Sequence, residues 1–428
     1  MSVAPIHERG AVSKPAPLAG EVDVAIVGGG LVGATLAAAL RDTCLRVLLV
    51  EGFRHDSAAQ PSFDERTTAL GNGTRSIFES LAVWTAMQSA AAPIRAIHIS
   101  DAGRFGFARL NAREQGADAF GYVVPNRVIG LALWGALAGA PRMTLRVPAR
   151  CDALTLEEDA AYLCVSADTQ HVERWRAALV VAADGAQSIV RGAAGIATSV
   201  EDYGQVALVV SIAADRANDG TAYERFTPSG PLAVLPLHDG GYTVVWTVTP
   251  DAAERMMGWP DAEFLAQLQQ CFGWRVGKLL RAGRRVTYPL QLTRAGASIG
   301  RRAVLVGNAA QALHPVAGQG FNLGVRDAAM LAEQLAAAAA GGTDSGAPDL
   351  LQKFAARRDS DRRVVTGFTD NLIKVFGSVR PGVRMARDLG LLLFDLLPPA
   401  KNALSHISWG SSGVVPRLAR GLPLVRAP

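Results

Sequence analysis

The sequence has few cysteines and no long apolar run, and both shortages narrow what the protein can be. Its four cysteines, Cys44, Cys151, Cys164 and Cys271, lie far apart and form no CxxC or CxxH pair, so neither a disulfide framework nor a zinc site is indicated. No apolar stretch approaches the roughly 18 residues that span a bilayer. We therefore expect a cytoplasmic protein with reduced thiols and no bound metal, whose membrane contact, if any, is peripheral.

Charge is also sparse. Charged residues make up 19% of the chain, the net charge is +5, and the basic residues are almost all scattered arginines. Because no Lys/Arg run is interleaved with aromatic residues, no nucleic-acid partner is expected. The small basic excess suits an anionic cofactor and an anionic membrane surface equally well.

A glycine-rich turn near the N-terminus is the first sign of function. Residues 22–50 predict a strand, a turn, a helix and a second strand, with Gly28, Gly30 and Gly33 in a GxGxxG pattern. In such a turn the first glycine makes the bend, the second lets a pyrophosphate approach the backbone, and the third allows close helix packing. Glu51 ends the second strand and could accept a hydrogen bond from a ribose hydroxyl. The pattern predicts a dinucleotide site.

A second glycine-rich loop follows the apolar run AVLV that precedes Gly307. Gly318, Gly320 and Gly324 are spaced so that backbone rather than side chain meets a ligand. A helix is expected to begin near Gly320, and its free N–H groups and positive dipole end favour a ligand that is anionic at some stage of its chemistry. We expect the rest of the chain to bring a cofactor to this loop.

Three further places carry polar residues next to predicted elements. Asp184 and Gly185 follow a buried strand, and ligands bind at such carboxyl ends of strands in α/β sheets. Arg66 lies in a polar loop where its guanidinium could meet a phosphate, and a solvated surface arginine is an equally good interpretation. Asn126 and Arg127 mark the start of a helix, which Asn126 is expected to cap.

The order of the elements indicates an α/β protein of two joined domains with a helical C-terminal region. The predicted parts are a disordered tail (1–20), a discontinuous Rossmann-like nucleotide-binding domain (21–100, 120–200 and 285–370), an inserted antiparallel β-sheet domain for the substrate (201–284, with a contribution from 85–119) and the C-terminal region (371–428). That last region is basic and partly apolar, so it could dock on anionic lipid or on a partner protein, or pack on the protein's own core.

Three motifs occur in a fixed order: GxGxxG, then D-G-x-x-S-x-x-R from Asp184, then G-[D/N]-A-A-x-x-x-x-P-x-x-G-Q-G-x-N-x-G-x-x-D from Gly307. In this order they resemble the flavin-dependent aromatic hydroxylases (group A monooxygenases) from about Val22 to Thr366. The last motif and the tail are most similar to the ubiquinone-biosynthesis branch, of the 2-octaprenyl-6-methoxyphenol hydroxylase type. Asn308 stands where most members have Asp, and Asn shares that place in this branch.

The resemblance implies FAD, with NAD(P)H as a transient reductant and O₂ as co-substrate, and hydroxylation of a prenylated phenol through a flavin C4a-hydroperoxide. The cofactor-binding residues that it implies are Gly28, Gly30, Gly33, Glu51, Arg66, Arg127, Asp184, Gly185, Asn308, Gly320 and Asn322. The residues expected beside the reacting ring are His314, Pro315, Gly318, Gln319 and Gly320. For His314, shaping the pocket is the alternative to a catalytic role.

Other functions fit the same motifs. A related hydroxylase could act on another ring position of a ubiquinone precursor or on a soluble phenol, a non-catalytic member of a ubiquinone-synthesis assembly could hold FAD, and an FAD-dependent reductase of prenyl lipids shares the first two motifs. The sequence holds no second GxGxxG with strand and helix flanks, so NAD(P)H is expected to bind only transiently. Partners implied are other ubiquinone-synthesis proteins and the cytoplasmic face of the inner membrane.

Overall fold

The computed structural model describes residues 17–57, 60–64, 66–104, 106–167, 171–312, 318–377 and 414–424. Residues 368–377 are described by their backbone alone. His314, Pro315, residues 1–16 of the predicted tail and most of the C-terminal region therefore lie outside the described residues. The first strand begins at Leu18, so the end of the predicted tail is ordered strand. No helix in the described ranges is long and apolar enough to cross a membrane.

The first sheet is the Rossmann-like core. Its parallel strands are β19 (Ala303–Leu305), β11 (Val172–Ala182), β1 (Leu18–Val27), β2 (Val47–Val50) and β8 (Met143–Arg146), in that order. Antiparallel additions are β18 (Ile299–Gly300), β10 (Ala161–Ser166) and β9 (Arg150–Leu156). β2 and the last four residues of β1 and of β11 are apolar runs, as expected for strands with both faces buried.

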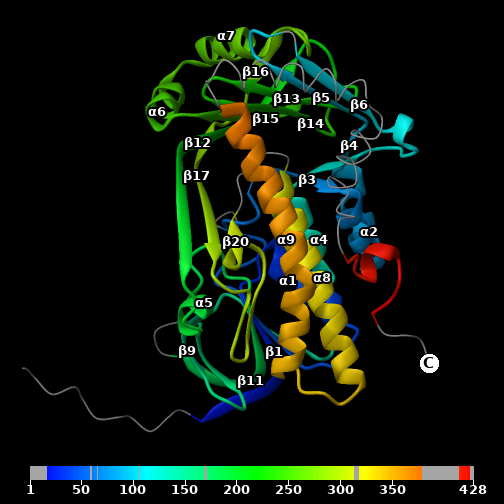
Figure 1. Cartoon of the computed structure of the whole chain (residues 1–428), viewed down its shortest axis with the longest axis vertical. Helices are drawn as coiled ribbons and strands as arrows, with labels where there is room; N and C mark the ends of the chain where they lie inside the picture. The colour runs from blue at the N-terminus through cyan, green and yellow to red at the C-terminus, as the bar shows by residue number, and fades with distance from the viewer. Residues whose placement is uncertain are drawn as a thin grey trace, which may run out of the picture.

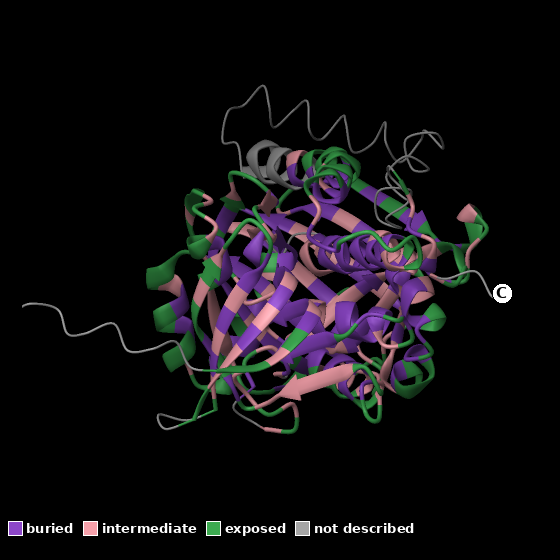
Figure 2. Ribbon diagram, turned by 90° about the horizontal axis from the view of Figure 1, so that it is seen from below, coloured by how far each residue is buried: buried purple, intermediate pink, exposed green. Residues whose placement is uncertain are grey.

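Helices cover one face of this sheet. They are α1 (Leu31–Leu40), α4 (Asn126–Gly135), α8 (Gln319–Ala340) and α9 (Pro348–Gly377). Val24, Leu36 and Val325 belong to one apolar core that joins this sheet face to the helices. Figure 1 shows α8 and α9 side by side, and Figure 2 shows the buried residues concentrated in the interior. The short α5 (Ile189–Ala193) lies on the β9 side.

The second sheet forms the other half of the molecule. Its order is β20 (Gln311–Ala312), β17 (Val286–Ala295), β12 (Thr198–Ala214), β15 (Tyr242–Val248), β14 (Gly230–Pro236), β13 (Thr221–Thr227), β5 (Ala96–Asp101) and β6 (Phe107–Asn111), with β16 (Leu279–Ala282) on β12. The helices α6 (Pro250–Gly258) and α7 (Asp261–Phe272) cover its outer face, away from the first sheet (Figure 1).

This second sheet differs in one respect from the antiparallel sheet that was predicted. The pair β13–β5 is parallel, because β5 comes from the earlier segment and enters beside β13 in the same direction. The contribution of that segment to the sheet was expected, but its direction could not be read from the sequence. The domain boundaries given above stay a prediction.

A small third sheet lies beside the other two. It consists of β3 (Thr67–Gly71), β7 (Gly121–Pro125) and β4 (Ala92–Ile94). The helices α2 (Asn72–Ser80) and α3 (Trp84–Met87) lie between β3 and β4 in the chain. Ala69 and Ile94 from this sheet join an apolar cluster with Ile97 and Ala222 of the second sheet. The small sheet thus links the two larger parts.

A buried ionic cluster fastens α8 to α9. Asp327 accepts hydrogen bonds from Arg358 Nε at 2.7 Å and from Arg362 Nη2 at 2.9 Å. Asp361 pairs with Arg358 Nη2 at 2.6 Å and with Arg326 Nε at 3.1 Å. Burial would raise the pKa of Asp327, but the charges of Arg362 and Arg358 outweigh burial and hold it below its ordinary value.

Candidate functional site

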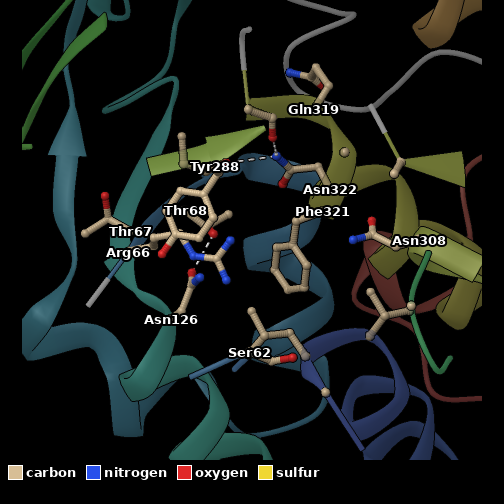
Figure 3. A pocket seen from close by; sticks show the side chains of 18 of the residues that line it. Ser62, Arg66, Thr67, Thr68, Asn126, Tyr288, Asn308, Gln319, Phe321 and Asn322 are labelled. Carbon is tan, nitrogen blue, oxygen red and sulfur yellow. Dashed lines mark hydrogen bonds between the residues drawn. The ribbon is translucent and has the colours of Figure 1, made fainter. Parts of the chain in front are cut away.

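A cavity of about 1840 Å³ lies between the two large sheets and the start of α8. It is lined by the GxGxxG turn at one end and by the inner face of the second sheet at the other. Figure 3 shows Arg66, Asn126 and Tyr288 on one side and Asn308 on the other, with Ser62 below them. Its volume exceeds the range of about 300–1,000 Å³ that is typical of a single small-molecule site. The space therefore suits a dinucleotide together with a second ligand.

The glycine turn at the first end leaves no room for side chains. Gly28 has φ +99°, and a Cβ on it would lie 2.4 Å from the Ala183 carbonyl oxygen. A Cβ on Gly33 would lie 1.9 Å from the carbonyl oxygen of Gly28. Gly30 borders the cavity, and a Cβ there would meet only Ser62. The turn thus presents bare backbone to a ligand, as the sequence predicted, and Gly33 acts by fitting against the turn itself.

Glu51 holds this turn in place as well as bordering the cavity. Its Oε2 accepts a hydrogen bond from the Gly29 N–H at 2.6 Å, and its Oε1 accepts from Phe53 N–H and Gln60 Nε2. The carboxylate is buried, and these donors compensate its loss of hydration. A ribose hydroxyl would join a network that already exists.

Asp184 and Gly185 border the same end of the cavity. Asp184 Oδ2 accepts from the Ile189 N–H at 2.8 Å, whereas its Oδ1 is buried and has no partner among the described residues. Burial raises the pKa of this carboxyl above its ordinary value. A buried acceptor without a donor is what a cofactor hydroxyl would satisfy.

Arg66 borders the cavity but is already engaged (Figure 3). Its Nε donates to Asp64 at 2.6 Å, and its guanidinium lies 4.4 Å above the Tyr288 ring, whose hydroxyl also donates to Asp64. Arg66 is therefore held in place by the protein itself at the edge of the cavity, and its contact with the cofactor stays a prediction. This cluster joins the loop before β3 to the second sheet, and nothing in the sequence pattern around Tyr288 signalled it.

The start of α4 differs from the prediction. Asn126 is buried and accepts a hydrogen bond from Thr68 Oγ1 at 2.6 Å, and no side chain caps this helix, so the capping role was wrong. Asn126 instead borders the cavity. Arg127 is exposed and is not among the lining residues, so the structure gives its predicted cofactor contact no support.

The start of α8 faces the cavity with backbone. Gly318 precedes the helix in the left-handed conformation (φ +60°), which glycine adopts without strain, and Gln319 and Gly320 form its first turn. All three border the cavity, as does Asn308. The positive end of a long helix therefore points at the cavity.

Asn322 joins this helix to the small sheet. Its Oδ1 accepts from Gly71 N–H and Thr74 Oγ1, and its Nδ2 donates to the carbonyls of Ala69 and Gly318 (Figure 3). An amide side chain has no further donors or acceptors to offer. The side chain was predicted to contact the cofactor, and the structure assigns it the positioning of the loop around Gly318.

We expect Asn322→Asp to loosen this junction. Aspartate keeps the acceptors but removes both donors, which leaves two partly buried carbonyls facing a carboxylate at a cost of about 1–2 kcal/mol. Urea denaturation should show the lower free energy of unfolding, and bound flavin should decrease in parallel. Equal stability of the two proteins would contradict the positioning role.

Comparison with known proteins identifies one family. A protein-family model described as "FAD binding domain" matches residues 21–369. The ubiquinone hydroxylase UbiL of Rhodospirillum rubrum is 36% identical, covering 94% of this chain and 93% of that protein. The chain belongs to the FAD-dependent hydroxylases of ubiquinone biosynthesis.

Other relatives of this hydroxylase agree. The 3-demethoxyubiquinol 3-hydroxylase of Escherichia coli is 33% identical, covering 86% of this chain and 94% of that protein. Among solved structures, p-nitrophenol 4-monooxygenase PnpA from Pseudomonas putida matches with a TM-score of 0.76 at 20% identity, covering 92% of this chain and 99% of that one. The predicted fold class is thereby confirmed. The hydroxylase is an FAD-dependent monooxygenase for which NAD(P)H and O₂ are the typical co-substrates of the family.

The residues around the cavity fit FAD. The bare glycine turn suits a pyrophosphate, the unpartnered oxygen of Asp184 suits a hydroxyl, and the start of α8 suits an electron-rich ring. The structure thus places all the predicted site residues at the cavity wall except Gly33, which acts from behind the turn, Arg127, which lies outside, and His314 and Pro315, which are not described. Thr68, Asn126 and Tyr288 also border the cavity, and the sequence did not predict this, since isolated polar residues carry no motif.

Proposed function

We propose that this enzyme hydroxylates the aromatic ring of a prenylated phenol in ubiquinone biosynthesis, with 2-octaprenyl-6-methoxyphenol as the first candidate. The observation that carries the proposal is the character of the second half of the cavity. There the walls are apolar, with residues such as Ile97, Val209, Leu235 and Val245. A prenylated ring is the kind of substrate that such walls would bind by removing apolar surface from water.

In this proposal each part of the chain has a task. Bound FAD supplies reducing equivalents from NAD(P)H and activation of O₂. The GxGxxG turn holds the pyrophosphate of FAD, and the carboxylates of Glu51 and Asp184 accept hydrogen bonds from FAD hydroxyls. The backbone amides of Gly318, Gln319 and Gly320, with the dipole of α8 behind them, stabilise negative charge near the reacting ring. The apolar walls exclude water from the reaction.

A second candidate is hydroxylation at another ring position. It is favoured by the similarity to a 3-demethoxyubiquinol 3-hydroxylase, at 33% identity. Ring position depends on how the cavity holds the ring, which the motifs do not encode.

The test uses a bacterial strain that lacks its own 6-methoxyphenol hydroxylase and carries this gene under aerobic growth. Mass spectrometry of the quinone lipids should show restored ubiquinone and loss of the accumulated prenyl phenol. Continued accumulation, with folded flavin-containing protein in the cells, would reject the first candidate. Strains blocked at the other ring hydroxylations would then test the second.

We further propose that the enzyme contacts the membrane peripherally, that it works with other ubiquinone-synthesis proteins and that His314 shapes the pocket. Flotation with anionic liposomes tests peripheral attachment, and failure of the full-length protein to float would reject it. For His314, an unchanged pH profile of turnover in His314→Ala would exclude a catalytic role.

A further inference from the structure

Glu224 is a carboxylic acid that the second sheet presents to the apolar half of the cavity. It lies in β13, between Ile99 of β5 and Ala233 of β14. Since side chains alternate along a strand, Ala222, Glu224 and Phe226 share one face, and all three border the cavity.

The neighbours of Glu224 along the strand confirm this orientation. Tyr223 packs edge-on against Phe272, and Arg225 donates to the Cys271 carbonyl at 2.9 Å, so both contact α7 on the outer face of the sheet. Glu224 is therefore directed to the opposite, inner face. It keeps some accessible surface although it lies inside the protein, because it borders the cavity.

The carboxyl has no polar partner there. No hydrogen bond or ion pair joins it to any other described residue. The cavity-facing residues of the adjoining strands are apolar, among them Ile97, Ile99, Val209, Ala233, Leu235 and Val245. Burial raises the pKa of Glu224 to about 7, with no contribution from a neighbouring charge.

A carboxyl in an apolar cavity wall without a polar partner is poorly solvated, and a ligand that supplies a hydrogen-bond donor would stabilise it. A prenylated phenol is apolar except for its ring oxygens, and its hydroxyl is a hydrogen-bond donor. We propose that Glu224 accepts the hydrogen bond of the substrate's phenolic hydroxyl and so sets which ring position faces the flavin. This inference rests on the proposed function and names the residue that would orient the substrate.

The location of Glu224 suits this task. Its cross-strand neighbour Ile99 belongs to the same apolar cluster as Ala69. Ala69 lies against the loop before α8, since a Cβ built on Gly318 would be 3.4 Å from the Cβ of Ala69. Glu224 and the loop that would hold the reacting ring therefore border one continuous apolar space.

Other titratable groups border the cavity in the described part of the chain. They are Glu51, Arg66, Arg150, Cys151, Asp184, Tyr288 and Tyr223, and the ring of Tyr223 packs on Phe272 at the other face of the sheet. The neighbours that face Glu224 from β5 and β14 are Ile99 and Ala233, which do not titrate. Titration of a group that does not touch the phenolic hydroxyl would change the binding of a phenol and of its methyl ether equally. The methyl ether therefore serves as the control ligand.

The experiment measures binding of a short-chain prenylated phenol and of its methyl ether to the FAD-containing enzyme, by the change in flavin absorbance. The carboxylate should bind the phenol more tightly than the neutral acid does. Because the ionised fraction of a group of pKa about 7 rises about tenfold between pH 6 and pH 8, the affinity for the phenol should rise about tenfold, and that for the ether should not.

Glu224→Gln has the same shape, and its amide can donate to an ether oxygen. The preference for phenol over ether should fall about tenfold, since a charge-assisted bond is replaced by a neutral one, and the pH dependence should vanish. Glu254→Gln in α6 is the matched control, because it removes the same charge from an exposed position on the outer side. Its ligand preference should equal that of the wild type.

The outcomes separate the two proposals. If none of the prenylated phenols supported NAD(P)H oxidation by the wild-type enzyme, the proposed function would be rejected. A wild type that turns over the phenol, while Glu224→Gln keeps the same phenol-to-ether preference, would overturn the role of Glu224 alone. Should Glu224→Gln not retain flavin, the pH series on the wild type decides, and equal pH dependence for phenol and ether would overturn the role.

Discussion

Gly33→Ala is expected to purify with little or no flavin. The added Cβ would lie 1.9 Å from the Gly28 carbonyl oxygen, and backbone at that distance cannot move aside as a flexible side chain could. The turn must shift, and the amides that would hold the pyrophosphate shift with it. Overpacking costs up to about 3 kcal/mol, so the affinity for FAD should fall about a hundredfold. Fluorescence titration of the apoprotein with FAD measures the change.

Gly135→Ala is the matched control for this substitution. Gly135 ends α4, and a Cβ there would have no atom within 4 Å. The same chemical change at that position should leave flavin affinity unaltered and could raise stability slightly through helix propensity. Full flavin content in Gly33→Ala would show that the turn does not position the cofactor.

Asp327→Asn is expected to lower the free energy of unfolding by about 3–5 kcal/mol, since removing one charge from a buried ionic cluster leaves its partners uncompensated. Arg358 and Arg362 would lose the carboxylate that accepts their hydrogen bonds, at positions that are 0% and 9% exposed. Because α9 packs on α8 through this cluster, the loss should appear at the helix that faces the cavity. Urea unfolding followed by circular dichroism and by flavin release measures it.

Asp159→Asn provides the comparison. Asp159 pairs with Arg176 at 3.0 Å on the surface, where the carboxylate is 65% exposed. Exposed pairs add little to stability, so this variant should unfold at nearly the wild-type midpoint. If both variants unfolded alike, the buried cluster would not be the clasp between α8 and α9.

The sequence predicted the parts of the site that depend on backbone. Glycine spacing between a strand and a helix has few structural solutions, so the turn around Gly28 and the start of α8 lie where they were expected. Side-chain partners were harder to predict, because they come from distant segments. Asn322 bonds residues about 250 positions earlier, and Arg66 stacks on Tyr288. Glu224 faces the cavity through strand alternation, and its register with β5 appears only in three dimensions.

The interleaving of the chain bears on when the protein can acquire its flavin during synthesis. The first sheet pairs β1, which begins at Leu18, through β11 with β19, which ends at Leu305, and its helical cover α8 ends at Ala340. A nascent chain therefore exposes the GxGxxG turn long before the opposite wall of the cofactor site exists. Contacts of such large sequence separation form late. FAD capture should thus be one of the last steps of biogenesis, and chains truncated before residue 340 should emerge from the ribosome without cofactor.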